Sequence, residues 1–164
     1  MTVALYPGTF DPLTNGHLDL IKRSIRMFDK VVVAIFENPT KGPLFSVEER
    51  RRLIEESTRG LSNIEIDTFS NTLLVFYAKQ RQAHVIVRGL RAIADFEYEF
   101  QMTMMNRHLR PQVETIFMMT GESHFYTSSR LVKEVVSLGG NVAGLIPDAV
   151  LPRLVERAAR FRSR

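Results

Sequence analysis

The chain has 164 residues, of which 45% are hydrophobic and 24% charged, a composition typical of one folded domain with a substantial core. It contains no cysteine, which excludes disulfides, thiol catalysis and cysteine-ligated metals. No apolar run approaches the roughly 20 residues of a membrane span, and no signal-peptide pattern opens the chain, so we expect a cytoplasmic protein with no membrane partner.

Basic charge is concentrated at the C-terminus. The formal net charge is +4, and residues 153–164 alone carry five arginines and one glutamate. The rest of the chain is therefore balanced. This distribution favours a solvated C-terminal helix or tail from about residue 148, with a frayed basic end, and a polyanion-binding tail is the alternative.

Short β-rich runs alternate with helical patterns along the chain. We predict strands over residues 3–6, 30–36, 64–69, 84–87 and 115–119. Helices are predicted over about 18–28, 46–57, 72–82, 95–109 and from 128 or 129 to Gly139-Gly140, the second of them opened by a Ser46–Glu49 capping box. The pattern indicates one α/β domain over residues 1–164, with a Rossmann-like, doubly wound, five-stranded parallel sheet and helices on both faces.

Polar segments follow four of the predicted strands. They are YPGTFDPLTNGH (6–17), ENPTKGPLFS (37–46), RGLRAIADFEYE (88–99) and TGESHFYTSS (120–129). In such sheets ligands bind outside the carboxyl ends of the strands, so we expect these segments to face one crevice.

The first polar segment has the features of an anion site. Gly8 would let the backbone turn and approach a ligand closely. His17, in the first turn of a helix, would point at an anion bound by the free N–H groups there. From spacing alone, a plain helix start with His17 as a capping or surface residue is equally consistent. The segment matches neither the P-loop nor GxGxxG.

Thr14-Asn15-Gly16-His17 resembles the (H/T)xGH motif of the nucleotidyltransferase superfamily. With RGLRAIADFEYE and TSSRLVKEV downstream, the string YPGTFDPLTNGH is similar to bacterial phosphopantetheine adenylyltransferases, a likeness that runs from Leu5 to about Pro147. It implies transfer of AMP from ATP to 4′-phosphopantetheine, giving dephospho-coenzyme A and pyrophosphate in coenzyme A biosynthesis. It also implies a homohexamer, and Mg²⁺ that accompanies ATP.

This resemblance gives expected roles to residues of the polar segments. His17 would stabilise the transition state, and Lys41 and Arg88 would bind the acceptor's phosphate, which makes these three the expected catalytic residues. Thr9 would contact both substrates, and Leu74 would line the pantetheine arm. The other expected ATP contacts are Phe10, Gly89, Leu90, Arg91, Glu99, His124, Phe125, Tyr126, Thr127, Ser128, Ser129 and Arg130. No residue is expected to bind a metal.

Structural roles are open alternatives for several of these residues. Arg88 and Arg91 would then pair with Asp95 or Glu97, and Lys41 would be a solvated loop lysine. The serines before Leu131 are typical of a helix N-cap. Arg130 stands where many relatives carry serine, which leaves the role of its side chain open.

Two functional alternatives also remain. One is a nucleotidyltransferase that acts on another phosphorylated acceptor, such as nicotinamide mononucleotide or glycerol phosphate. The other is a nucleic-acid-binding domain, which predicts basic residues interleaved with aromatic ones, whereas the excess basic charge here is confined to the tail.

Overall fold

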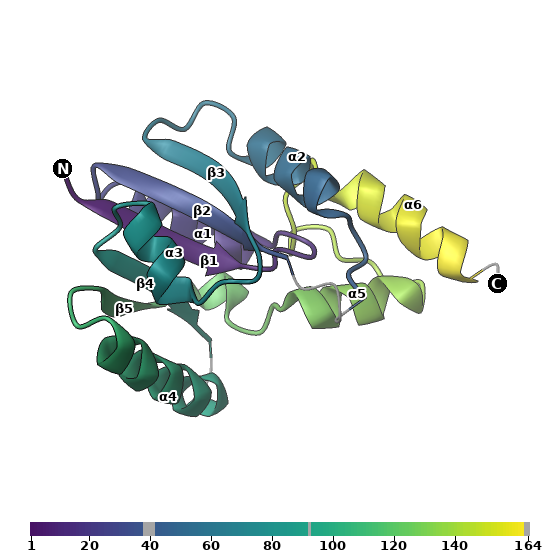
Figure 1. Ribbon diagram of the computed structural model, residues 1–164. Helices are drawn as coiled ribbons and strands as arrows, with labels where there is room; N and C mark the ends of the chain where they lie inside the picture. Colours follow the sequence, from purple (N-terminus) through teal and green to yellow (C-terminus); the bar gives the residue numbers. More distant parts are fainter. Residues whose placement is uncertain (38–41, 92, 163–164) are drawn as a thin grey trace.

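The computed structural model describes residues 1–37, 42–91 and 93–162 (Figure 1). Its centre is a parallel sheet in the order β3-β2-β1-β4-β5. The strands are β1 (Val3–Gly8), β2 (Lys30–Phe36), β3 (Ile64–Phe69), β4 (Val85–Leu90) and β5 (Glu114–Met119). The predicted Rossmann-like fold is confirmed, including the number of strands and their parallel direction.

Six α-helices are described. They are α1 (Asn15–Ser24), α2 (Val47–Ser57), α3 (Leu74–Gln80), α4 (Ile93–Leu109), α5 (Ser129–Ser137) and α6 (Leu151–Arg162), and a short 3₁₀ helix, η2 (Glu122–His124), precedes α5. All the predicted helices are present, and the Ser46–Glu49 capping box opens α2 as expected. None of the helices in these described ranges is long and apolar enough to cross a membrane.

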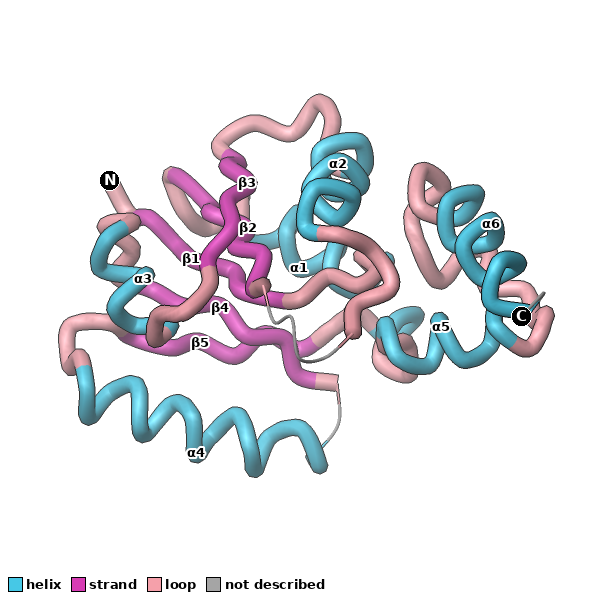
Figure 2. Tube along the Cα trace, turned by 45° about the vertical axis from the view of Figure 1, so that its right-hand side comes forward, coloured by secondary structure: helices cyan, strands magenta, loops and turns pink. Residues whose placement is uncertain are grey.

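The sheet is apolar on both faces because its strands alternate between two cores. Ala4 and Tyr6 of β1 belong to the core formed with α1, α2, α5 and α6. Val3 and Leu5 belong to the core on the opposite face, which α3 covers. Phe96 of α4 packs its ring on Phe117 of β5, with 5.8 Å between ring centroids. Figure 2 shows α5 and α6 beyond the carboxyl ends of the strands.

The switch in strand order lies between β1 and β4. The chain builds outward from β1 through β2 to β3, and then returns to the other side of β1 with β4. Arg88, Gly89 and Leu90, predicted to follow the strand, instead form the last three residues of β4 and pair with β5. They still end at the switch point, where ligands bind in this class of sheet.

The C-terminal helix is docked on the domain, which corrects the prediction of a solvated helix. Leu154 is fully buried and Ala158 nearly so. Arg157 forms an ion pair with Glu49 of α2, and its guanidinium lies over the Phe45 ring, 5.5 Å from the ring centroid. Part of the basic charge of this helix is therefore used to attach it to α2.

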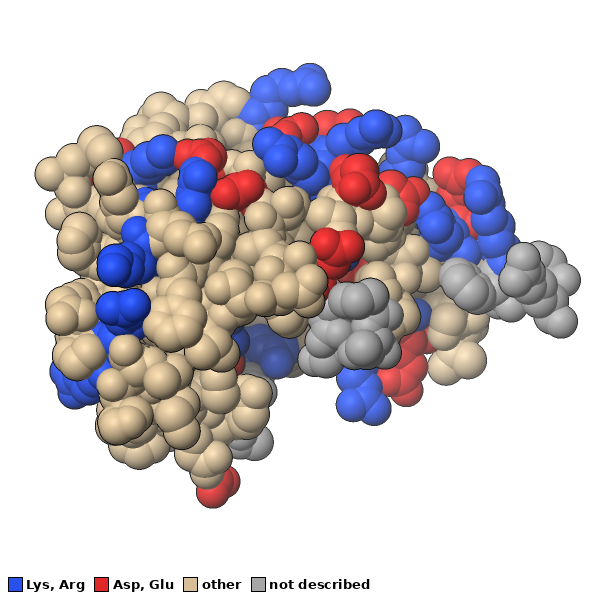
Figure 3. Space-filling model, in the orientation of Figure 1, with Lys and Arg blue, Asp and Glu red and all other residues tan. Residues whose placement is uncertain are grey.

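Helix α4 carries apolar side chains around most of its circumference. Those that stay exposed are Phe96, Tyr98, Phe100, Met102, Met104, Met105 and Leu109. In Figure 3 the surface over α4 is mostly uncharged, whereas charged side chains gather over α2 and α6. A helix that is apolar all round is normally covered on every side, so this surface is suited to contact another protein chain.

Candidate active site

His17 is fixed by the start of α1. The Thr14 hydroxyl accepts a hydrogen bond from the His17 N–H (3.3 Å), and the Thr14 N–H donates to Nδ1 of the His17 ring (3.0 Å). The alternative that His17 caps the helix is thus confirmed, and among the described residues the other ring nitrogen, Nε2, has no hydrogen bond. Because a backbone N–H can only donate, Nδ1 carries no proton, and the neutral ring has its proton on Nε2.

The surroundings keep this ring neutral. Burial lowers the pKa of His17 to about 4, and the positive charges of Arg91 and Arg88 act in the same direction. At neutral pH His17 therefore presents an Nε2–H donor and no positive charge. Such a donor can hydrogen-bond a phosphate oxygen without exchanging a proton with it.

Phe10 supports the His17 ring. Its side chain is buried, and its ring meets the His17 ring edge-on with 5.2 Å between centroids. A Cβ on Gly8 would lie 2.8 Å from the Phe10 ring. The absence of a side chain on Gly8 is therefore needed for packing of the Phe10 ring. The expectation that Gly8 lets the backbone approach a ligand closely stays a prediction. The expected contact of Phe10 with ATP stays a prediction, and because the side chain is buried it would involve the backbone.

Arg88 is held between β1 and α4. Its guanidinium binds both carboxylate oxygens of Glu99, with 2.7 Å from Nε to Oε2, and donates to the Pro7 carbonyl at 3.2 Å. The alternative that paired Arg88 with Asp95 or Glu97 named the wrong partner. Glu99, expected to contact ATP, has both carboxylate oxygens bound to Arg88 here.

Residues 120–128, called here the second loop, bring together several of the predicted ATP contacts. Arg91 donates to the Thr127 carbonyl at 3.3 Å. The loop lies against the start of α1, since a Cβ on Gly16 would be 3.4 Å from Cβ of His124. Within the part of the chain that the structure describes, Nδ1 of His124 and the buried hydroxyl of Thr127 have no hydrogen-bond partner. Buried polar atoms rarely stay unpaired, so this loop is suited to a polar ligand or ordered water.

The serines that follow the second loop already have structural partners. The Ser128 hydroxyl caps α5 by accepting from the Leu131 N–H at 3.0 Å, as the capping alternative predicts. The Ser129 hydroxyl donates to the Pro12 carbonyl at 2.7 Å. These side chains hold α5 in place, which leaves the backbone at the start of α5 as the contribution available to a phosphate.

The remaining predicted residues divide by exposure. Thr9, Phe125, Tyr126 and Arg130 are exposed. Leu90 is buried, and Gly89 makes room for Leu20 of α1, whose Cδ1 would lie 2.5 Å from a Cβ there. Leu74 is half-buried and packs into the core beneath α3. Lys41 lies outside the described residues.

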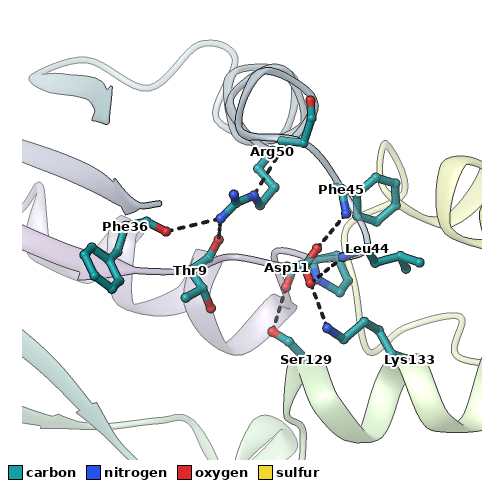
Figure 4. Close-up of polar contacts among 10 residues, drawn as sticks. Thr9, Asp11, Phe36, Leu44, Phe45, Arg50, Ser129 and Lys133 are labelled. Carbon is teal, nitrogen blue, oxygen red and sulfur yellow. Dashed lines mark hydrogen bonds and ion pairs between the residues drawn. The ribbon is translucent and has the colours of Figure 1, made fainter. Parts of the chain in front are cut away.

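Three charged residues of the site were not predicted from the sequence. The buried Asp11 carboxylate accepts from the N–H groups of Leu44 and Phe45 (both 2.9 Å) and from the Lys133 ammonium group (2.7 Å), as Figure 4 shows. The sequence did contain one indication of the Asp11–Lys133 ion pair. A carboxylate such as Asp11, within a segment expected to bind anions, needs a cationic partner within the protein.

Arg50 is the third of these residues, and its side chain is fully buried. It donates to the carbonyl groups of Thr9 (2.8 Å), Phe36 (3.3 Å) and Ser46 (3.3 Å). It thereby joins the segment after β1 to the end of β2 and to the start of α2 (Figure 4).

The start of α1 is also attached to the turn before α6. The Asn15 N–H donates to the Leu145 carbonyl at 2.9 Å, and its side-chain amide donates to the Gly144 carbonyl at 2.7 Å. Among the described residues, no group of three or more His, Asp, Glu or Cys side chains gathers as metal ligands would.

Comparison with known proteins extends over nearly the whole chain. Residues 5–135 match the family model described as cytidylyltransferase-like. A phosphopantetheine adenylyltransferase from Desulfatibacillum aliphaticivorans is 54% identical over 151 residues, which are 92% of this chain and 86% of that protein. Another, from Caldanaerobacter subterraneus subsp. tengcongensis, is 52% identical over 157 residues, 96% of this chain and 98% of that protein.

Solved structures share the architecture at much lower identity. A bifunctional NMN adenylyltransferase/ADP ribose pyrophosphatase from Francisella tularensis matches with a TM-score of 0.70 and 16% identity, over 99% of this chain and 52% of that one. A putative nicotinate-nucleotide adenylyltransferase from Vibrio parahaemolyticus matches with a TM-score of 0.68 and 19% identity, over 94% of this chain and 99% of that one. At these identities the likeness shows a common fold.

Proposed function

Because the chain belongs to the phosphopantetheine adenylyltransferase family, we propose that it transfers AMP from ATP to 4′-phosphopantetheine, a step of coenzyme A biosynthesis. The observation that carries this proposal is identity of 52–54% to members of that family over more than nine-tenths of the chain. An oxygen of the acceptor's phosphate attacks the α-phosphorus of ATP, the bond to the bridging oxygen breaks, and pyrophosphate leaves. The products are dephospho-coenzyme A and pyrophosphate.

This reaction requires little acid–base catalysis by the protein. The attacking phosphate oxygen is already ionised near neutral pH, so positioning and charge stabilisation supply the catalysis. The neutral His17 ring fits that task, because its Nε2–H can donate to an α-phosphate oxygen as negative charge develops there. No step requires His17 to gain or lose a proton.

We assign the triphosphate to the second loop and the start of α5. The unpaired Thr127 hydroxyl and His124 Nδ1 are available to it, and Arg91 adds positive charge beside them. Magnesium enters with ATP as part of the substrate, held by phosphates and water.

Acceptor binding is assigned to Arg88 and Lys41 for the phosphate and to Leu74 for the pantetheine arm. Arg88 keeps its orientation through Glu99, so its guanidinium is fixed before the acceptor arrives. Lys41 takes its role from the family resemblance.

Self-association is a further part of the proposal. The exposed apolar side chains of α4 support contact between copies of the chain, and the family resemblance sets the expected number at six. We place the activity in the cytoplasm. A nucleic-acid partner is disfavoured, because Arg157 and Arg160 of α6 already pair with Glu49 and Glu156.

A coupled pyrophosphate-release assay tests the function. ATP is supplied with 4′-phosphopantetheine, pantetheine, nicotinamide mononucleotide or glycerol phosphate in turn. We expect turnover with 4′-phosphopantetheine and none with pantetheine, which lacks the nucleophile. Faster turnover with nicotinamide mononucleotide would show that the acceptor is assigned wrongly.

A further inference from the structure

Residues 9–14, called here the first loop, hold one residue in an unfavourable conformation. Phe10 has a φ of 48°, in the left-handed region that residues other than glycine, asparagine and aspartate seldom occupy. Its ring nevertheless sits in the space left by Gly8 and against the His17 ring. Such backbone persists only where its surroundings fix it, and it is concentrated at functional sites.

Buried charged residues fix the peptide on both sides of Phe10. On one side, Arg50 donates to the Thr9 carbonyl at 2.8 Å. On the other, the Asp11 carboxylate is bound by two backbone N–H groups and by Lys133. Figure 4 shows these contacts coming from three directions: α2, the segment before α2, and α5.

Phe10 connects these charged residues with the His17 ring. Arg50 and Asp11 set the backbone on either side of Phe10, and the Phe10 ring then limits how the His17 ring can tilt. We propose that Arg50, Asp11 and Lys133 are positioning residues for adenylyl transfer, which act on His17 through Phe10. This proposal rests on the proposed function for its effect on turnover, but not for its effect on the His17 ring.

Two variants test this arrangement, and they should destabilise the fold to different degrees. Asp11→Asn keeps the size of the side chain but loses the ion pair and one strong acceptor. Lys133→Met removes only the ion-pair partner, whose side chain is 34% exposed, and therefore leaves a folded protein for comparison. The matched control is Glu55→Gln, which breaks the exposed Arg51–Glu55 pair on α2.

We expect a loss in kcat and not in ATP affinity. A displacement of about 1 Å at a catalytic group can cost roughly 100-fold. Asp11→Asn should therefore lower kcat by about tenfold or more, with KM for ATP changed less than about threefold, and Lys133→Met should show the same pattern more weakly. Glu55→Gln should leave both constants unchanged.

The decisive measurement is the coupling to His17. In a His17→Ala background, Asp11→Asn should lower kcat by less than about threefold, because the group that it positions is gone. A full, independent loss in that background would overturn the proposal and assign Asp11 to the fold alone.

A readout without turnover separates this proposal from the proposed function. In NMR spectra with the imidazole carbons labelled, the His17 resonances should shift in Asp11→Asn and in Lys133→Met but not in Glu55→Gln. Unmoved resonances in both variants would overturn the positioning role even if the wild-type enzyme turns over. Shifted resonances in a protein without adenylyltransferase activity would support the positioning role and refute the proposed function.

Discussion

The first loop packs Phe10 against the His17 ring, and the second loop lies against Gly16 at the start of α1. The two loops differ in how their polar groups are satisfied. In the first loop the Asp11 carboxylate, the Thr14 hydroxyl and the Thr9 carbonyl all have partners within the protein. In the second loop the Thr127 hydroxyl and His124 Nδ1 are buried without one in the described part of the chain. These three groups of the first loop need no further partner, whereas the two groups of the second loop are suited to a ligand or ordered water.

This difference indicates that the two loops contribute to different steps, the first to the transition state and the second to substrate binding. Groups fixed before substrate binds meet charge that develops only in the transition state, so their loss lowers kcat. Groups that gain their partner from the ground-state substrate contribute to its affinity, so their loss raises KM. Substitutions in the two loops should therefore change different constants.

The largest effect is expected at His17, whose ring packs against Phe10 of the first loop. His17→Ala removes a preorganised donor, which typically costs roughly 100- to 1,000-fold in kcat. We expect the variant to fold and to bind ATP with little change, as measured by steady-state kinetics and by calorimetric titration with ATP. A near-normal kcat combined with a lower Tm would mean that His17 only caps α1.

A smaller effect, on KM for ATP and not on kcat, is expected for a substitution in the second loop. Thr127→Val removes a buried hydroxyl that has no protein partner, so the free enzyme should keep its Tm while KM for ATP rises about tenfold, the value of one hydrogen bond to a charged group. The matched control is Thr58→Val. The Thr58 hydroxyl is also buried, but it donates to the Ile54 carbonyl at 2.7 Å. The Thr58→Val variant should therefore have a lower Tm and an unchanged KM for ATP. Equal loss of Tm in both variants would remove the contrast between the loops.

The pH dependence of stability tests whether burial and the nearby arginines keep His17 neutral. The pKa of His17 is about 4 in the folded protein against an ordinary value of 6.5, so the unfolded chain binds a proton in this range that the folded chain does not. Stability should be complete above pH 6.5 and fall as the pH drops toward 4. His17→Gln, which has no such proton to bind, should lose Tm less steeply between pH 7 and 4.5. Parallel curves for the two proteins would show that the His17 pKa is not lowered.

The smallest effect is expected just after the second loop, in the first turn of α5. Because the Arg130 side chain is exposed, Arg130→Ser should change kcat/KM for ATP by less than about tenfold, or 1.4 kcal/mol. A larger loss would mean that the Arg130 side chain binds the triphosphate in addition to the buried groups of the second loop.

Much of the fold could be predicted because its signals are local. The Val-rich run at 30–36 is β2 without a shift at either end, and Ser46 and Glu49 cap α2 through contacts three residues apart. The His17 position was predicted for the same reason, since the TNGH motif and the helix start are contiguous. Extending β4 through Leu90 was missed because Gly89 is unusual within a strand, and only packing against Leu20 explains it.

The network behind the site could not be predicted in this way. The partners of Asp11 are 33, 34 and 122 residues away, and those of Arg50 include Thr9, 41 residues away. No period or motif in the sequence reports such pairs. The C-terminal helix was misjudged for a related reason, because the distant Glu49 and Phe45 that attach Arg157 give no local signal.

The attachment of Asn15 to Gly144 and Leu145 has a consequence for synthesis of the protein. The reactive motif is complete once residue 17 has been made, but the chain that holds it in place ends about 130 residues later. At roughly 5–20 residues per second, the ribosome needs on the order of ten seconds to cover that distance. During that time the nascent chain carries the TNGH motif without α5, Lys133 or the turn before α6. The enzyme therefore gains its catalytic centre near the end of translation, and a chain that stops short of α6 should be inactive however well its sheet has formed.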